Sequence, residues 1–222
     1  VVVFRAYLRW LYTQGLQTAY WSKKDYDGWL VKVGRLQAYR EPGVTCLTAL
    51  GKGVMGTLEN PINQSLGCGC VIRVLPVGLI EDETCVFDIA TRLAAITHGN
   101  PTSYLSAGTF AYIINQIIEG REIEEAVEIA CQRLKEEVQH EEVLAIIEKA
   151  ILLAKEKEPS REKMESLGTG FLAHEVLGMA IYAVLSYPND YTKAILFAVN
   201  HSGDSDSIGA ITGSILGAAL GR

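Results

Sequence analysis

The 222-residue sequence predicts an all-α fold in a single domain, with a buried helical core and polar helices outside. Three observations predict this fold class. Apolar residues recur at helical spacing along most of the chain, no segment alternates cleanly between apolar and polar residues, and no internal repeat divides the sequence. A chain of this length can bury a sizeable core. We therefore expect residues 1–222 to form one compact domain of packed helices.

The first third of the chain predicts short helices separated by irregular structure. Residues 1–14 carry apolar side chains at helical spacing and predict an amphipathic helix. Residues 15–43 mix aromatic, charged and glycine residues, so we expect a loop with a helical turn. A short helix is expected at residues 44–58, followed by a loop at residues 60–70. Residues 71–80 are apolar but contain a proline, which disfavours an internal strand and leaves the start of a short helix as the other interpretation.

The remaining two thirds of the chain are helical in period, beginning with apolar faces at residues 83–97 and 103–119. Gly120 is the expected residue just beyond the second of these helices. The next two helices carry Glu/Lys pairs at helical spacing, which predicts that they lie on the outside of the protein. A polar connector is expected at residues 158–166. The four later helical segments are residues 123–138, 141–157, 171–187 and 191–199.

A run of small residues from Ile208 to Gly221 closes the chain. Glycines recur in it at every fourth position, a spacing typical of closely packed transmembrane helices. The apolar stretch covers only 13 residues, whereas a membrane span needs about 20. We therefore expect a buried helix whose glycines let another backbone approach, and no membrane span.

Composition and charge exclude several classes of protein. The net charge is −6 and no cluster of Lys and Arg stands out, so no nucleic-acid partner is expected. The five scattered cysteines favour a reducing, cytoplasmic location over a disulfide framework. Cys68 and Cys70 form a C-x-C pair, but no second pair at zinc spacing accompanies them. No secretory signal is visible at the start of the sequence.

The most informative segment is the acidic turn that precedes the last helix. Asp204 and Asp206 are two residues apart, so a loop can direct both carboxylates toward one point, and the Ser207 hydroxyl can add a further oxygen. Such oxygen ligands suit a hard cation such as Mg²⁺. Capping of the following helix is the other interpretation, and the spacing alone leaves both open. An EF-hand is disfavoured because Ile208 and Ile215 occupy two of its ligand positions.

Three glycine-containing segments could contact a ligand. The loop of residues 65–70 alternates small residues, which lets main-chain N–H groups approach a phosphate or a sugar. His98, between two helices, could donate to a phosphate or interact with a helix dipole. Gly168 and Gly170 precede a helix and could form an edge of an anion or nucleobase site, or could keep a loop small for packing.

Taken in order, these segments resemble the ADP-ribosylglycohydrolase family, which includes the dinitrogenase-reductase-activating glycohydrolases. The family's fold is all-α, and the resemblance implies a compact orthogonal helix bundle. The similarity covers nearly the whole chain, and its last motif is the most specific. The matching motifs are Gly67-Cys68-Gly69 with Arg73 and Pro76-Val77-Gly78-Leu79, then Thr97-His98-Gly99-Asn100-Pro101, then Gly168-Thr169-Gly170 with Ala173 and Glu175, and finally His201 to Ser207 with Gly209-Ala210.

The resemblance implies an activity and a set of site residues. Family members bind a pair of divalent cations, usually Mg²⁺ or Mn²⁺, and cleave the glycosidic bond between ADP-ribose and a protein side chain or small acceptor. By resemblance, half of the metal shell would come from Asp204, Asp206 and Ser207. The substrate-binding residues implied are Gly67, Cys68, Gly69 and Cys70 for the diphosphate or distal ribose, His98 for the phosphate region, and Gly168, Gly170 and Phe171 for the ADP-ribose cleft.

The sequence also departs from the family. Two acidic motifs near the family's N-terminus, which supply the other metal ligands, are absent, so we expect that residues are missing upstream. A carboxylate that activates water is expected in that segment, and no catalytic residue is assigned. Two alternatives therefore stay open: an inactive relative that binds ADP-ribose or serves a structural role, and a hydrolase of other nucleotide or phosphate-sugar substrates. The sequence does not indicate the acceptor.

Overall fold

The computed structural model describes residues 1–18, 27–156 and 158–221. Within these ranges the protein is helical, and its single β-type contact is an isolated antiparallel bridge between Gly67 and Leu172. The predicted all-α fold is confirmed. No helix in the described ranges is both long enough and apolar enough to cross a membrane.

The helices follow one another along the chain with short connections after residue 60. Three short 3₁₀ turns accompany them: η2 (Leu30–Lys32), η3 (Gly34–Leu36) and η4 (Leu75–Leu79). The α-helices are α1 (Val2–Thr13), α2 (Val44–Gly51), α3 (Gly69–Ile72), α4 (Glu83–Ala95), α5 (Pro101–Ile118), α6 (Ile123–Leu134), α7 (Glu141–Lys155), α8 (Arg161–Glu165), α9 (Ala173–Ser186), α10 (Tyr191–Val199) and α11 (Ser205–Leu220).

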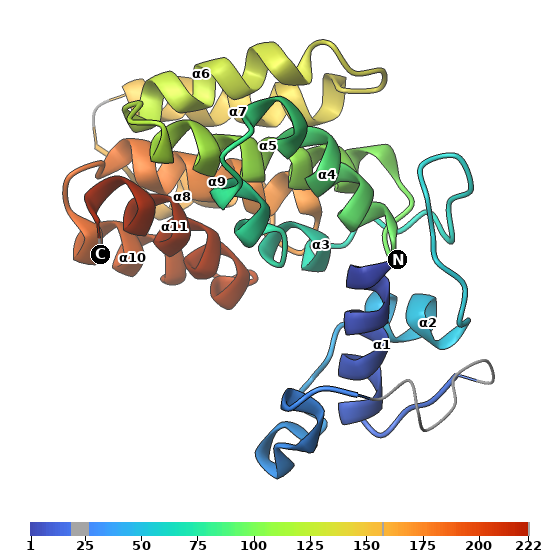
Figure 1. Cartoon of the computed structure of the whole chain (residues 1–222). Helices are drawn as coiled ribbons and strands as arrows, with labels where there is room; N and C mark the ends of the chain where they lie inside the picture. Colours follow the sequence, from blue (N-terminus) through green and yellow to red (C-terminus); the bar gives the residue numbers. More distant parts are fainter. Residues whose placement is uncertain (19–26, 157, 222) are drawn as a thin grey trace.

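Two helices, α5 and α9, form the centre of the main body (Figure 1). Helix α5 packs against α4, α6, α9 and α11, and α9 packs against α7, α10 and α11. Both are apolar or small on nearly every face, which is the pattern of a fully buried helix. Gly108 lets α4 approach α5 closely, because a Cβ there would lie 2.4 Å from the Thr91 hydroxyl oxygen.

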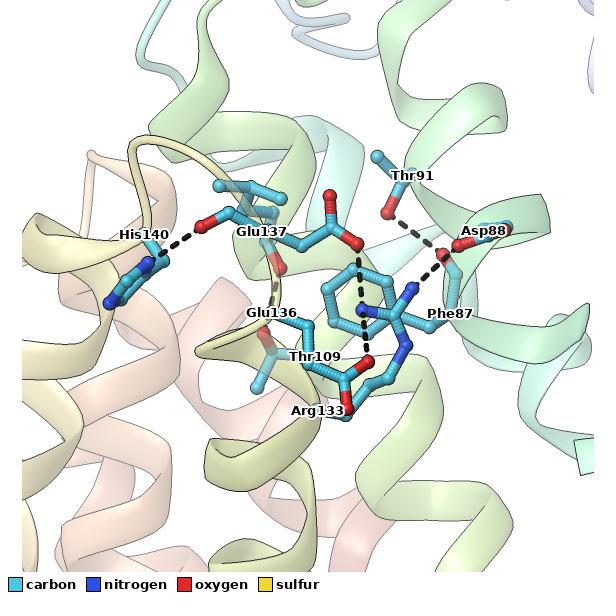
Figure 2. Close-up of polar contacts among 9 residues, drawn as sticks. Phe87, Asp88, Thr91, Thr109, Arg133, Glu136, Glu137 and His140 are labelled. Atoms are coloured by element: carbon cyan, nitrogen blue, oxygen red, sulfur yellow. Dashed lines mark hydrogen bonds and ion pairs between the residues drawn. The ribbon is translucent and has the colours of Figure 1, made fainter. Parts of the chain in front are cut away.

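The charged helices α6 and α7 lie at the outer edge of the body, as their Glu/Lys pairs predict (Figure 1). An ion-pair network joins α6 to α4 (Figure 2). The Arg133 guanidinium lies 4.3 Å from the centre of the Phe87 ring and donates to Asp88 at 2.8 Å and to Glu137 at 2.6 Å. Arg133 therefore combines a cation–π contact with two charge-assisted hydrogen bonds at the end of α6.

The N-terminal helices form a small lobe that extends from the end of α4 (Figure 1). Leu8 and Leu11 of α1 pack with Leu50 of α2 and with Ile96, in a cluster separate from the main core. The loop predicted at residues 15–43 contains the turns η2 and η3, and its residues 19–26 lie outside the described ranges.

Some predicted element boundaries are wrong. The helix expected at residues 44–58 ends at Gly51, because Gly53 adopts a left-handed conformation with φ of 69°. The connector expected at residues 158–166 contains helix α8, whose first turn is capped by the Ser160 hydroxyl. For residues 71–80 the helical interpretation is confirmed, because the segment contains the end of α3 and the turn η4.

The last helix, α11, packs closely on α10, as its glycine spacing predicts. A Cβ at Gly209 would lie 2.7 Å from a methyl group of Val199, and one at Gly213 would lie 3.3 Å from the Tyr191 hydroxyl. Because α11 is held against α10 and α9, its first residues lie at a fixed place beside the turn that precedes α9.

Candidate functional site

Four segments that are far apart in the sequence meet at one surface. They are the loop before α3, the turn between α4 and α5, the turn before α9 and the first residues of α11. Two main-chain hydrogen bonds join the first and third of these. The N–H of Cys68 donates to the carbonyl of Phe171 at 3.1 Å, and the N–H of Ala173 donates to the carbonyl of Leu66 at 2.8 Å.

The acidic turn before α11 is fixed against the turn before α9. The N–H of Asp204 donates to the carbonyl of Thr169 at 2.8 Å. Gly203 is required at this contact, because a Cβ there would lie only 1.9 Å from the same carbonyl oxygen. His201 supports the turn by accepting the N–H of Gly203 at its Nδ1 atom, at 2.9 Å. Burial lowers the pKa of His201, which keeps this nitrogen free to accept.

The turn before α9 is held by a single carboxylate. The Oε2 atom of Glu175 accepts hydrogen bonds from the main-chain N–H groups of Thr169 and Gly170 and from the Thr169 hydroxyl. Gly168 and Gly170 have φ values of 132° and 82°, which disfavour any other residue. A Cβ at Gly168 would also lie 2.4 Å from Glu175, and one at Gly170 would lie 2.6 Å from Ile208, so both glycines keep the turn small. A ligand contact of this pair stays a prediction. Phe171 follows it with 59% of its surface exposed.

Asp204 stands at the N-cap position of α11, yet within the described ranges its side chain makes no capping hydrogen bond. Its Oδ2 atom instead accepts a hydrogen bond from the Cys68 thiol at 3.2 Å. Burial raises the pKa of Cys68 to about 12, with the neighbouring Asp204 carboxyl adding to the effect, so the thiol keeps its proton and donates. The Asp204 side chain therefore does not cap the helix, and the capping interpretation is wrong for this residue.

Asp206 and Ser207 complete the acidic turn. Asp206 is exposed, and its Oδ1 atom accepts the N–H of Ser207 at 2.8 Å. Ser207 is buried, with its hydroxyl oxygen 3.7 Å from the Cys68 sulfur. Burial raises the pKa of Asp204, and its side-chain contact with Asp206 raises it further, whereas the same contact lowers the pKa of Asp206. Two carboxyl groups in contact repel one another when both are charged, and a positive charge beside them would relieve that repulsion.

The donor set of this turn fits a hard cation in part. Carboxylate and hydroxyl oxygens are the ligands that Mg²⁺ and Mn²⁺ prefer. Across the described ranges, no set of three or more His, Cys, Asp or Glu side chains is grouped to hold a metal ion. Asp204, Asp206 and Ser207 alone would be at most part of a coordination shell, whose remaining ligands would have to be water, substrate or other oxygen atoms.

His98 lies behind the loop before α3, where it is 1% exposed. Its ring is next to the loop: a Cβ on Gly67 would lie 3.4 Å from the His98 Nε2 atom, and one on Gly69 would lie 4.0 Å from its Cε1 atom. Burial and the nearby Arg73 charge lower the pKa of His98 to about 3. A neutral imidazole gains little from a helix dipole, so the dipole interpretation is not supported.

The remaining predicted site residue, Cys70, is fully buried and donates from its thiol to the carbonyl of Ser103 at 3.5 Å. Its side chain thus packs beneath the loop. The motif analysis missed Asn63, which links two of the site's turns. Asn63 donates to the carbonyl of Thr97 at 2.8 Å and accepts the N–H groups of Ser65 and Gly99 at 3.0 and 3.1 Å. The signal available in the sequence was the Asn itself in a Gly/Asn/Ser loop, because an Asn side chain there commonly accepts the main-chain N–H two residues on.

The fold and the site define a class of all-α protein in which a glycine-rich loop, a buried histidine and an acidic helix start share one surface. The model of the family described as ADP-ribosylglycohydrolase matches residues 2–222. The chain therefore belongs to the ADP-ribosylglycohydrolase family, as the resemblance of its motifs implied.

Two relatives show how far the similarity extends. The chain is 32% identical over 185 residues to an uncharacterized protein of Archaeoglobus fulgidus, covering 78% of this chain and 55% of the relative. It is 28% identical over 160 residues to ADP-ribosylarginine hydrolase Tri1 of Serratia proteamaculans, covering 71% of this chain and 40% of that protein. The chain spans about half the length of the curated relatives it matches.

Proposed function

We propose that this protein is a hydrolase, or part of one, that cleaves the glycosidic bond of ADP-ribose attached to a protein side chain or a small acceptor. The observation that carries the proposal is the contact between the glycine-rich loop and the acidic turn. The Asp204 carboxyl does not cap its helix and accepts a hydrogen bond from Cys68 instead. Membership of the family supports the reaction class. ADP-ribosylated arginine is the first substrate to test, because one relative is an ADP-ribosylarginine hydrolase.

The cation of this reaction would be Mg²⁺ or Mn²⁺, as a pair of ions in the complete protein, with Asp204, Asp206 and Ser207 as ligands on this side. A divalent cation supplies a positive charge that orients ribose hydroxyls and acidifies water. The exposed Asp206 carboxylate would meet it first. Burial and the contact with Asp206 raise the pKa of the half-buried Asp204 carboxyl, and a neighbouring cation would oppose that shift by favouring the charged form.

The chain's own residues would bind and orient the nucleotide sugar. The small residues Gly67 and Gly69 let the diphosphate or distal ribose approach the main chain of the loop. His98 lies behind that loop and offers a ring nitrogen to a phosphate oxygen. The exposed ring of Phe171, beside Gly168 and Gly170, offers an apolar face for the base or ribose. Cleavage at the anomeric carbon passes through an oxocarbenium-like state, so fixed orientation of the ribose favours it.

The test measures cation binding and substrate turnover in three matched variants. Asp204→Asn and Asp206→Asn each remove one carboxylate from the proposed site. Asp190→Asn is the control: Asp190 caps the neighbouring helix α10 through the N–H of Lys193, and Asn is an equally good N-cap. Calorimetry with Mn²⁺ alone reports binding, and release of ADP-ribose from an ADP-ribosylated arginine peptide reports activity.

We expect Asp204→Asn and Asp206→Asn to weaken Mn²⁺ binding at least tenfold and to abolish turnover, while Asp190→Asn retains both. Equal Mn²⁺ affinity in all three variants would reject the metal site. Failure of the wild-type protein to bind ADP-ribose, with or without Mn²⁺, would reject the substrate class.

A relative that binds ADP-ribose without cleaving it is the second candidate. It is favoured by the sparse grouping of metal-ligating side chains within the described ranges. Tight binding of ADP-ribose that is unchanged by EDTA, together with no turnover of arginine-, serine- or O-acetyl-linked ADP-ribose, would select this candidate over the hydrolase.

A further inference from the structure

The Thr97 hydroxyl oxygen is the middle of a short buried hydrogen-bond chain that runs from Arg73 to His98. Arg73 donates from its Nη2 atom to the Thr97 Oγ1 atom at 2.6 Å, and the same oxygen lies 2.8 Å from the Nδ1 atom of His98. Thr97 is completely buried. Among the residues that the structure describes, these are the two hydrogen-bond partners of the Thr97 hydroxyl.

This geometry decides which His98 nitrogen carries the ring proton. Arg73 can only donate, so it occupies an acceptor site of the Thr97 oxygen. The single hydroxyl proton of Thr97 then has one remaining partner, the His98 Nδ1 atom, and a buried hydroxyl left without an acceptor is costly. Nδ1 therefore accepts. The imidazole is kept neutral by burial and by the Arg73 charge, with its pKa lowered to about 3, so its one proton is on Nε2.

The protonated Nε2 atom faces the glycine-rich loop. A Cβ built on Gly67 would lie 3.4 Å from it, and no hydrogen-bond partner for this nitrogen occurs in the described part of the chain. The main chain around the ring is held in place: the His98 N–H donates to the carbonyl of Ala94 at 3.0 Å, and the Asn63 side chain donates to the carbonyl of Thr97. A rigid, almost fully buried side chain thus directs one N–H donor toward the loop without a partner.

We propose that Arg73 and Thr97 are positioning residues that fix His98 as a neutral Nε2–H donor for an acceptor oxygen of a ligand bound over Gly67 and Gly69. The identity of that oxygen, a phosphate oxygen of ADP-ribose, rests on the proposed function; the state of the imidazole does not. Arg73 is itself held in place, since its guanidinium also donates to Cys46 and to the end of α4 and lies 4.8 Å from the centre of the Tyr7 ring.

The first test reads the ring nitrogens directly by NMR in the ligand-free protein. The chain has four histidines, and the signals missing from a His98→Gln variant assign those of His98. Long-range ¹H–¹⁵N correlations then identify the protonated nitrogen. We expect Nε2 to be protonated and Nδ1 to be unprotonated. A protonated Nδ1, or two protonated nitrogens at pH 7, would overturn the proposal whether or not ADP-ribose binds.

The second test compares two substitutions of the positioning residue. Thr97→Ser retains the hydroxyl, whereas Thr97→Val keeps the shape and removes it. We expect Thr97→Ser to keep the wild-type nitrogen signals and ADP-ribose affinity. Thr97→Val should shift the His98 signals toward a mixture of tautomers and weaken ADP-ribose binding about threefold to tenfold, the worth of one hydrogen bond. Unchanged signals and affinity in Thr97→Val would overturn the proposal.

A third comparison separates the two faces of the ring. Gln at position 98 places its amide near the Nε2 position, and Asn places its amide near the Nδ1 position. His98→Gln should therefore retain more ADP-ribose affinity than His98→Asn, because it keeps a donor toward the loop. The reverse order would contradict the assigned direction of donation. Absence of ADP-ribose binding in the wild-type protein would instead reject the proposed function, and the nitrogen signals would still decide the tautomer.

Discussion

Burial of the His98 imidazole makes its neutral form part of the folded structure. The folded pKa is about 3, against an ordinary value of 6.5, because the ring is removed from water and lies near the Arg73 charge. Between these two values the unfolded chain binds a proton that the folded chain excludes. Folding stability must therefore be complete above pH 6.5 and must fall as the pH decreases toward 3.

We expect this one residue to lower the free energy of unfolding by about 2 kcal/mol between pH 7 and pH 5, at about 1.4 kcal/mol for each pH unit below 6.5. Urea unfolding at both pH values measures it. His98→Gln should lose less stability than the wild-type protein over the same interval, by about that amount. His140→Gln, which changes a histidine at the half-buried start of α7, is the control. An equal loss in wild type and His98→Gln would contradict the buried neutral state.

At the scale of elements, the turn before α9 depends on a glycine conformation that other residues rarely adopt. Gly168 has φ of 132°, and a Cβ there would lie 2.4 Å from the Glu175 Cδ atom. Any substitution would both strain the backbone and displace the carboxylate that holds Thr169 and Gly170. The turn also supports Asp204, whose N–H donates to the Thr169 carbonyl.

Gly168→Ala should therefore lower the free energy of unfolding by about 2 kcal/mol or more, since a strained φ alone costs about 1–3 kcal/mol. Gly34→Ala is the matched control, because that position has no positive φ and open space for a Cβ, and it should change stability little. Urea unfolding of both variants measures the difference. A Gly168→Ala protein as stable as the control would show that the turn can relax without loss.

Helix periodicity predicted the long elements but not the short ones. Helices α4, α5, α9 and α10 follow from apolar residues at helical spacing, because each is long enough to show that spacing over more than two turns. Helix α8 was missed because five residues show no period, and its start depends on the Ser160 side chain. The hydrogen bond between Cys68 and Asp204 joins residues 136 positions apart. Motif order indicated which segments belong to a site, but no local pattern encodes such a contact.

At the scale of the whole molecule, the N-terminal lobe and the main body have cores of very different size. The lobe depends on a small cluster of Leu8, Leu11, Leu50 and Ile96, whereas the body buries most of α5 and α9. Stability is then unequal across the molecule, since the free energy of local opening follows the apolar surface buried. Arg73 joins the two parts, because it lies on the Tyr7 ring of α1 and donates to the end of α4.

Native-state hydrogen exchange should show α1 and α2 opening at a lower free energy than α5 and α9. Leu50→Ala removes a fully buried lobe residue, at a cost of about 2–5 kcal/mol, and should speed exchange in α1 while leaving the slowest amides of α9 unchanged. Ile147→Ala, in the main core, should instead speed exchange in α9. Equal effects of Leu50→Ala on α1 and α9 would mean that the protein opens as one unit.

The main-chain pairing of the loop before α3 with the turn before α9 has an evolutionary consequence. Both hydrogen bonds there, from Cys68 to Phe171 and from Ala173 to Leu66, run between main-chain atoms. The side chain at position 171 can therefore be exchanged while the loop and the turn stay in register, whereas Cys68 also contacts Asp204 through its thiol. Natural or engineered diversification of this surface can alter what it recognises without rebuilding the scaffold that presents it.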